Sequence, residues 1–363
     1  RGLLESVDPS LLQRGSIDEM VKAGVDRLMS MQTPSGGFAY WPGGHRPSEW
    51  GTAYALHLLI DAREAGFDVP AEPVADALEW LHEEVGDLSS DSVNSTVAYQ
   101  HYVLAKAGKG RPADAAAMLE ALPARRKGSK GLSRRRWDEA EFLLQAAMFA
   151  GGDRRHERAL QAEANDLVAT SRGLDHDYYS DRRSRAMRLD VLEDLFKGST
   201  AGEALADRVA SDLSGHPSRW YTTQELAWGI SALGKRTAGL SNTSLDATLE
   251  VGGTALARTD GRKKGDISWT LRGATGLDDV ELEVEGAGAR QWLVTTVEGA
   301  RAVDDLPVGG DGLKISRTWL TAKGEPVDWS SHALGDRLFV RVDVTNTSKR
   351  RVSNVAVVDR LPA

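Results

Sequence analysis

The sequence has 363 residues and a formal net charge of −8, so it is long enough for two or three domains. This acidic balance argues against nucleic acid as a partner, because phosphates attract basic surfaces. No apolar run reaches the about 18 residues of a membrane-spanning helix. Cysteine is absent, so these residues can form no disulfide. The chain opens at Arg1 without a signal-like segment and stops after a strand-like run, so we expect a piece of a longer polypeptide.

Helical periodicity dominates the sequence as far as residue 238. Several periodic segments open on Ser, Thr, Asn or Pro, and most are followed by a glycine, as helix termini prefer. A shorter piece at residues 3–12 precedes them. The predicted helices cover residues 16–31, 52–65, 73–84, 94–107, 112–122, 137–150, 155–169, 184–196, 201–213 and 222–235.

Strongly apolar helices alternate with mixed ones along this part of the chain. A double ring of helices needs this alternation, because its inner helices are buried all round and its outer helices on one face only. A Gly-rich turn with Phe38, Tyr40 and Trp41 joins the first two helices, as in the joints of such a ring. We therefore predict an α/α toroid over residues 1–238. The ten predicted helices and the short piece at residues 3–12 together fall one short of six pairs. We therefore expect a first helix upstream of Arg1.

Period-two alternation with glycine turns replaces the helical pattern after Gly239. The predicted strands cover residues 245–251, 254–257, 267–271, 280–284, 291–297, 313–320, 337–345 and 352–359. The fold class we predict is α+β and multidomain, an α/α toroid followed by antiparallel β-sandwich portions. The hinge between the two parts is predicted at residues 239–243.

Three separated motifs in the right order closely resemble bacterial α2-macroglobulins, relatives of vertebrate α2-macroglobulin and the complement components. The thioester domain of that family is similar to Gln-Thr-Pro-Ser-Gly-Gly-Phe at residues 32–38, Tyr-Trp-Pro-Gly-Gly at 40–44 and Trp-Gly-Thr-Ala-Tyr at 50–54. Residues 220–228 resemble its last toroid helix, and residues 354–362 resemble the start of the C-terminal macroglobulin-like domain. The resemblance thus spans nearly the whole chain.

The resemblance implies a division into three domains. Residues 1–238 would be the thioester-like toroid, whose first helix is missing. Residues 243–305 would be the second half of a complement-type β-sandwich, into which the family inserts the toroid. Residues 311–363 would be the first strands of a truncated C-terminal macroglobulin-like domain.

The family's reactive group is an internal thioester between Cys and Gln in a Gly-Cys-x-Glu-Gln motif, whose acyl carbon is open to a lysine amine. No residue here can be that cysteine, so the resemblance places the thioester upstream of residue 1. Gln224 follows Thr223 rather than Cys. We interpret Thr222 to Glu225 as a helix capping box, with Gln224 a surface or hinge contact.

Four residues are candidates for the surroundings of such a thioester: Tyr40, Trp41, His45 and Trp50. The rings could shield the thioester from water, but we favour core packing at the toroid joint and expect Trp41 to be buried. His45 lies in a Gly-rich loop, where an imidazole could exchange protons near neutral pH. His57 lies within an apolar helix and is interpreted as a satisfied core residue. No metal-ligand spacing, phosphate loop or nucleophile elbow is present, so we expect no cofactor and no metal.

The resemblance implies a broad-spectrum endopeptidase inhibitor that traps proteases after cleavage of a bait region. It would not be an enzyme, because thioester conjugation is single-turnover. A thioester-less, non-covalent trap of the same family is a second possibility. A toroid enzyme of terpene-cyclase type is a third, since Gln32, Gly36 and Phe38 resemble a repeat of those enzymes, but their Asp-rich motif is absent.

The family also implies where such a chain works and what it meets. Target proteases would be its partners, together with a periplasmic peptidoglycan synthase. The expected location is the periplasm, as a lipoprotein of bacterial defence that is anchored to a membrane through the missing N-terminal part.

Overall fold

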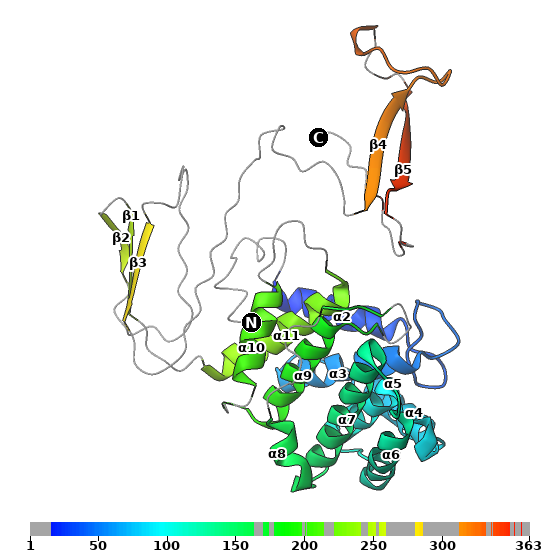
Figure 1. Ribbon diagram of the computed structural model, residues 1–363, viewed down its shortest axis with the longest axis vertical. Helices are drawn as coiled ribbons and strands as arrows, with labels where there is room; N and C mark the ends of the chain where they lie inside the picture. The colour runs from blue at the N-terminus through cyan, green and yellow to red at the C-terminus, as the bar shows by residue number, and fades with distance from the viewer. Residues whose placement is uncertain are drawn as a thin grey trace. The chain divides into compact units, whose positions relative to one another are not determined.

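Figure 1 shows the computed structural model of the chain. The chain divides into two compact units, residues 1–292 and 293–363. None of the helices described is long and apolar enough to cross a lipid bilayer. The residues that the structure describes are 16–162, 170–173, 178–197, 200, 202–213, 221–240, 246–251, 254–258, 280–285, 312–331, 335, 337–348, 352 and 357.

Helices make up most of the described chain, as the sequence predicts. The predicted helix at 155–169 is wrong in extent. A 3-10 turn at Arg154–His156 leads into a short helix, α8, which ends at Leu160. The predicted helical piece at 3–12 lies outside the described residues. The helices are α2 (Ile17–Met29), α3 (Glu49–Glu64), α4 (Ala71–Gly86), α5 (Ser95–Lys106), α6 (Pro112–Arg125), α7 (Gly131–Ala150), α8 (Glu157–Leu160), α9 (Asp181–Leu195), α10 (Glu203–Leu213) and α11 (Thr223–Leu240).

Polar side chains cap several of the helix starts, as expected from the sequence. Ser16 accepts a hydrogen bond from the Glu19 amide while the Glu19 carboxylate accepts one from the Ser16 amide, a complete capping box. Ser48, Asn94 and Ser180 likewise accept from backbone amides at the starts of α3, α5 and α9. Each cap satisfies a donor that the first helical turn leaves free.

The helices alternate between two kinds of burial. In α5 every side chain except Thr96 and Lys106 is buried. The neighbouring α4 buries a single stripe, Val74, Ala77, Leu81 and Val85, which is the spacing of an amphipathic helix. Helix α5 contacts α3 and α7, α7 contacts α9, and α9 contacts α11, while α4, α6 and α10 pack against this series. A helix-rich fold with alternating buried and amphipathic helices is therefore confirmed.

The strands form two separate antiparallel groups. In the first unit β1 (Asp246–Val251) lies between β2 (Thr254–Arg258) and β3 (Val280–Glu285), with Leu249 opposite Leu282. In the second unit β4 (Leu313–Leu320) pairs with β5 (Phe339–Asn346). The predicted strands at 267–271 and 291–297 lie outside the described residues, as does most of 352–359. The predicted sandwiches and domain boundaries stay predictions.

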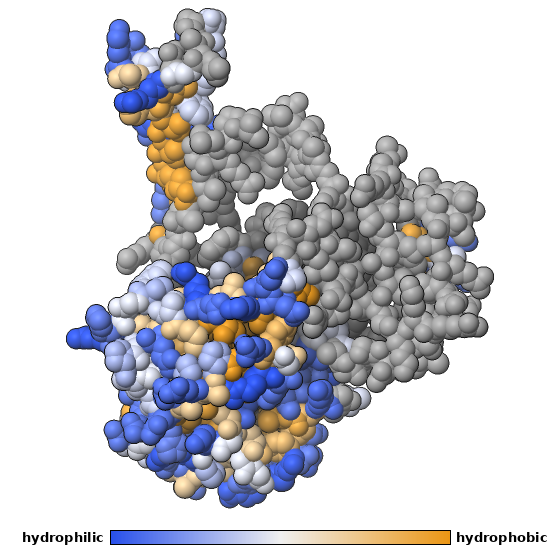
Figure 2. Space-filling model, turned by 180° about the vertical axis from the view of Figure 1, so that it is seen from behind, coloured by the Kyte–Doolittle hydropathy of each residue, from blue (hydrophilic) through white to orange (hydrophobic). Residues whose placement is uncertain are grey.

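The β4–β5 ribbon carries most of its apolar side chains on one face. Ile315 lies opposite Val344, and Trp319 lies opposite Val340, so these four side chains point to the same side. Ile315 and Val344 are exposed, and a hydrophobic stripe runs along the ribbon in Figure 2. A two-stranded ribbon with one apolar face is stable only when another layer covers that face.

Candidate functional site

The Gly-rich loop between α2 and α3 is anchored from inside. The Gln32 amide donates hydrogen bonds to the carbonyl oxygens of Gly36 (2.9 Å) and Pro73 (2.7 Å), which ties the loop to the start of α4. The Phe38 amide donates to Thr52 Oγ1 at 2.9 Å, and the Phe38 ring is buried. The first half of the Gly-rich loop is thus fixed by hydrogen bonds to neighbouring helices and by the buried Phe38 ring.

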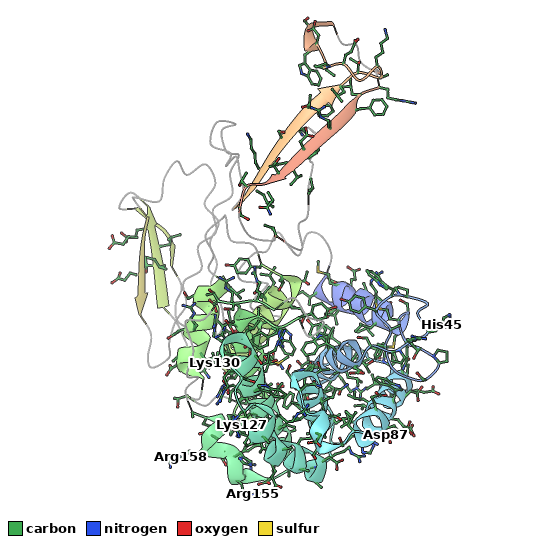
Figure 3. The ribbon with its side chains drawn as sticks, turned by 45° about the vertical axis from the view of Figure 1, so that its right-hand side comes forward. His45, Asp87, Lys127, Lys130, Arg155 and Arg158 are labelled. Carbon is green, nitrogen blue, oxygen red and sulfur yellow. The ribbon has the colours of Figure 1, made fainter. Side chains whose placement is uncertain are left out.

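The second half of the loop carries exposed aromatic rings. Tyr40 is 53% exposed and Trp41 is 68% exposed. Their rings meet edge to face, and the Tyr40 hydroxyl hydrogen-bonds that of Tyr178, which precedes α9. His45 is exposed on the same loop and projects from the edge of the helical unit in Figure 3. Core packing therefore does not explain Tyr40 or Trp41, and our expectation that Trp41 is buried is wrong.

Trp50 differs from the other three candidates in its burial. It is buried at the start of α3, where its ring lies 4.9 Å from that of Tyr99 between centroids. The guanidinium of Arg183, which is fully buried, lies 5.1 Å from the ring centroid of Trp50 and donates to Glu139 Oε1 at 2.8 Å. For Trp50 the packing interpretation agrees with the structure. A thioester-shielding role for Tyr40, Trp41 and His45 stays a prediction.

The capping box predicted at the start of the last helix is confirmed. The Thr222 amide donates to the Glu225 carboxylate at 3.0 Å, and the Glu225 amide donates to Thr222 Oγ1 at 3.1 Å. Gln224 Oε1 accepts from the indole of Trp228 at 3.2 Å. Gln224 therefore has a structural partner within its own helix.

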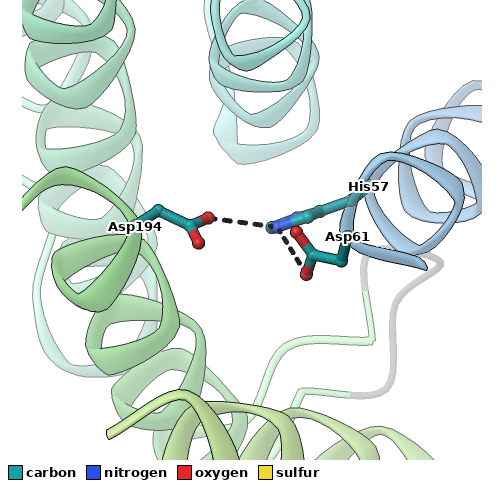
Figure 4. A group of neighbouring side chains, drawn as sticks. All are labelled: His57, Asp61 and Asp194. Carbon is teal, nitrogen blue, oxygen red and sulfur yellow. Dashed lines mark ion pairs between the residues drawn. The ribbon is translucent and has the colours of Figure 1, made fainter. Parts of the chain in front are cut away.

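A group of charged side chains from four helices meets around His57 inside the helical unit. His57 is 2% exposed, and its Nδ1 lies 3.0 Å from the Tyr99 hydroxyl. Its Nε2 faces three carboxylates, at 3.6 Å from Asp61, 3.4 Å from Asp190 and 3.6 Å from Asp194. Figure 4 shows His57 with Asp61 and Asp194. We call the following residues the buried charge network: His57, Asp61, Lys106, Asp190, Asp194 and Lys235.

Two lysines complete the network. Lys106 of α5 lies 2.8 Å from Asp61 and 2.5 Å from Asp194. Lys235 of α11 lies 2.8 Å from Asp61, 2.7 Å from Asp190 and 2.8 Å from Asp194. Four helices, α3, α5, α9 and α11, therefore meet through these six side chains.

The network shifts the pKa values of His57, Asp190, Asp194 and Lys235 in the direction that favours their charged forms. Burial by itself would lower the pKa of His57, but Asp190, Asp194 and Asp61 outweigh it, and the pKa of His57 lies above its ordinary value. Burial would raise the pKa of Asp190 and of Asp194, yet His57 and the lysines hold both below the ordinary range. The same carboxylates overcome burial at Lys235 and raise its pKa.

His57, Asp61 and Asp194 bring potential metal-ligand atoms within 4.8 Å of one another. A cation there would have to displace the ammonium groups, because Lys106 and Lys235 already lie against these carboxylates. We therefore assign the residues to an ion-pair network and not to a metal centre.

The position of His57 within an apolar helix correctly indicated a buried, partnered histidine, but the sequence did not reveal the network around it. Asp190 and Asp194 repeat at one-turn spacing in α9, and Asp61 stands one turn after His57 in α3. Charged residues placed inside apolar helices were the available signal, but only the fold shows that they meet.

Comparisons with known proteins agree with the sequence motifs. Residues 5–107 match the family model of the A-macroglobulin TED domain. The α2-macroglobulin of Xylella fastidiosa strain Temecula1 is 27% identical over 95% of this chain and 21% of its own length. That of Escherichia coli K12 is 26% identical over 96% of this chain and 21% of its own length. A crystal structure of a mutant Salmonella α2-macroglobulin superposes with a TM-score of 0.56 at 26% identity, covering 92% of this chain and 21% of that one.

This chain is similar to the bacterial α2-macroglobulins over most of its length. It spans about a fifth of the length of the α2-macroglobulins that it matches. The stretch matched by the TED model contains the Gly-rich loop and the helices α2 to α5. The buried charge network joins this stretch to α9 and α11, which lie beyond it.

Proposed function

We propose that this chain is part of a protease trap of the α2-macroglobulin type, an endopeptidase inhibitor that acts after a bait region is cut. The observation that carries the proposal is that relatives named α2-macroglobulin align with 95% and 96% of the chain. The trapping activity belongs to a longer protein, of which these residues would form the thioester-like part and adjoining β-structure.

The described helices support a ring as the architecture of this part. The inner series α3, α5, α7, α9 and α11 runs through successive contacts. Its two ends also meet, because Tyr54 of α3 lies 5.6 Å from Trp228 of α11 between ring centroids, and Asp61 pairs with Lys235. Contact between the first and last members of a series is what an α/α toroid requires.

Covalent trapping would need a thioester from outside these residues, since the sequence has no cysteine. The test uses the full-length protein with a broad-specificity protease. If a thioester is present, we expect a protease conjugate that survives denaturing electrophoresis, and methylamine pretreatment should release about one thiol per chain and abolish the conjugate. Bait cleavage with retention of the protease but no thiol would establish the non-covalent trap instead. Failure to retain any protease would reject both forms.

A periplasmic location with a lipid anchor, and a peptidoglycan synthase as a further partner, belong to the same proposal. They rest on the family resemblance. Fractionation of cells that express the full-length protein tests the location, and co-purification from membranes tests the partner.

A further inference from the structure

The last helix before the β-structure is held by buried charge. Lys235 stands near the end of α11 and reaches two helices at once, Asp61 of α3 and the pair Asp190 and Asp194 of α9. The Ser231 hydroxyl adds a hydrogen bond to Asp190 at 2.7 Å. The position of α11 therefore depends on a few buried electrostatic contacts in addition to apolar packing.

The charges in the network balance only in one protonation state. Three carboxylates face two ammonium groups, which leaves one negative charge that an imidazolium at His57 neutralises. Glu64 lies 4.0 Å from Lys106 and is exposed, so it stands at the edge of the network. Burial raises the pKa of each tyrosine nearby, so these stay neutral. The titratable groups that face His57 or its partners are Tyr54 and Asp61 of α3, Tyr99, Tyr102 and Lys106 of α5, Asp190, Glu193 and Asp194 of α9, and Lys235 of α11. Glu193 is itself neutralised by Arg236 of α11 at 2.9 Å.

We propose that His57 is a proton-dependent latch: its imidazolium holds α11 against α3 and α9, and loss of that proton loosens the helix that leads into the β-structure. A neutral imidazole would leave one uncompensated negative charge in a buried site, with the Nε2 lone pair aimed at three carboxylates. Such a charge is costly in the interior. Opening the α11 end of the network lets water reach the carboxylates and relieves this cost.

The direction of the pH effect follows from proton linkage. The latched state binds the His57 proton more tightly than an opened, hydrated state, whose histidine has an ordinary pKa near 6.5. Below that pH both states are protonated and opening is independent of pH. Above it the opening equilibrium rises by up to about tenfold per pH unit until the latched His57 itself deprotonates, after which it is constant.

Hydrogen exchange on the complete chain tests the latch. Opening constants of amides in α11 and α4 are compared between pH 6 and pH 9, after correction for the intrinsic pH dependence of exchange. We expect opening of α11 to increase by up to about tenfold per pH unit above 6.5, while α4, which contributes nothing to the network, stays constant. Equal pH dependence in the two helices would overturn the proposal.

Variants at two buried histidines sharpen the result. His57→Gln should remove the pH dependence and leave α11 as open at pH 6 as the wild type is at high pH. His101→Gln is the matched control, because His101 is also buried but lies outside the network, and it should keep the wild-type dependence. If both variants behave alike, the latch is rejected.

A measurement on the unmodified chain covers the case in which His57→Gln does not fold. The His57 imidazole is identified in NMR spectra by its contacts with the Tyr99 and Tyr102 rings, whose centroids lie 5.9 and 5.8 Å away. A titration midpoint above 6.5 is required by the proposal. A midpoint below 6.5 contradicts it directly.

Discussion

Trp41 and Trp50 show how little of a residue's environment a local motif specifies. Both rings flank the same Gly- and Pro-rich loop, yet Trp41 is 68% exposed and Trp50 is 6% exposed. Trp50 falls on the first turn of α3, where helical spacing directs it toward Tyr99 and Arg183. Trp41 stands in a turn, where side chains follow no helical or strand periodicity. The sequence therefore does not predict whether the Trp41 ring is buried or exposed.

Truncation of the two tryptophans should therefore give opposite results. Trp50→Ala removes a ring that is packed on all sides and should lower the free energy of unfolding by about 3–5 kcal/mol. Trp41→Ala should change it by no more than about 0.5 kcal/mol. Urea unfolding of both variants measures the difference. If Trp41→Ala also abolished protease retention in the full-length protein, the shielding role would be supported. Equal losses of stability would show that the loop packs differently.

His101 should make the protein less stable in acid, the opposite of His57. Burial lowers the pKa of His101 to about 4, and both of its ring nitrogens lack a hydrogen-bond partner among the described residues. The unfolded chain takes up a proton below pH 6.5, whereas the folded His101 resists it until about pH 4. As the pH is lowered from 6.5 to about 4, His101 alone should thus lower the free energy of unfolding by about 1.4 kcal/mol per pH unit.

His101→Gln should remove that contribution. Urea unfolding of the wild type and the variant at several values between pH 6.5 and pH 4 gives the two slopes, and their difference should approach the amount above. Parallel slopes would mean that His101 is protonated in the folded state or reaches water. Sequence alone could not separate His57 from His101, because both stand in apolar helices and differ only in the partners that the fold brings to them.

The helical elements were the most predictable part of the molecule. Apolar spacing and capping residues placed the starts of α2, α5 and α6 within a few residues. The start of α7 was missed, because the basic run before Trp137 has no apolar stripe. In the structure Arg134 pairs with Asp138 and Arg135 pairs with Asp181, so long-range and one-turn ion pairs extend the helix to Gly131.

Two glycines in the loop before α3 provide a matched test of whether that loop packs against α4. Both have positive φ, +96° at Gly36 and +75° at Gly43. A Cβ at Gly36 would lie 2.6 Å from the carbonyl oxygen of Asp76 in α4, whereas one at Gly43 would meet nothing within 4 Å.

Gly43→Ala should cost about 1–2 kcal/mol, the strain of a left-handed alanine. Gly36→Ala should cost a further ~1–3 kcal/mol, because the backbone of α4 must move to admit the methyl group. Thermal unfolding of the two variants measures both costs. Similar costs would show that the loop does not rest on α4.

The whole molecule depends on contacts that no local pattern contains. Tyr54 with Trp228, and Asp61 with Lys235, join the two ends of the inner helix series across most of the helical sequence. Alternating apolar and amphipathic helices predicted a double ring of helices. The residues through which α3 meets α11, and the charge network that they create, required three-dimensional information, because pairing between distant segments has no sequence period.

The helical part should fold without the β-structure. In the described chain, the buried residues of the main hydrophobic cluster begin at Val25 and end at Ala232. None of them comes from β1 to β5. A fragment of residues 1–240 therefore retains the complete cluster and the buried charge network. Since burial of this apolar surface is the main source of stability, we expect the fragment to show a helical far-UV circular dichroism spectrum. Its unfolding midpoint should lie within a few degrees of that of the helical transition in the full chain. A strand-rich or unfolded fragment would reject an independent helical domain and would place the boundary nearer residue 292, where the first compact unit ends.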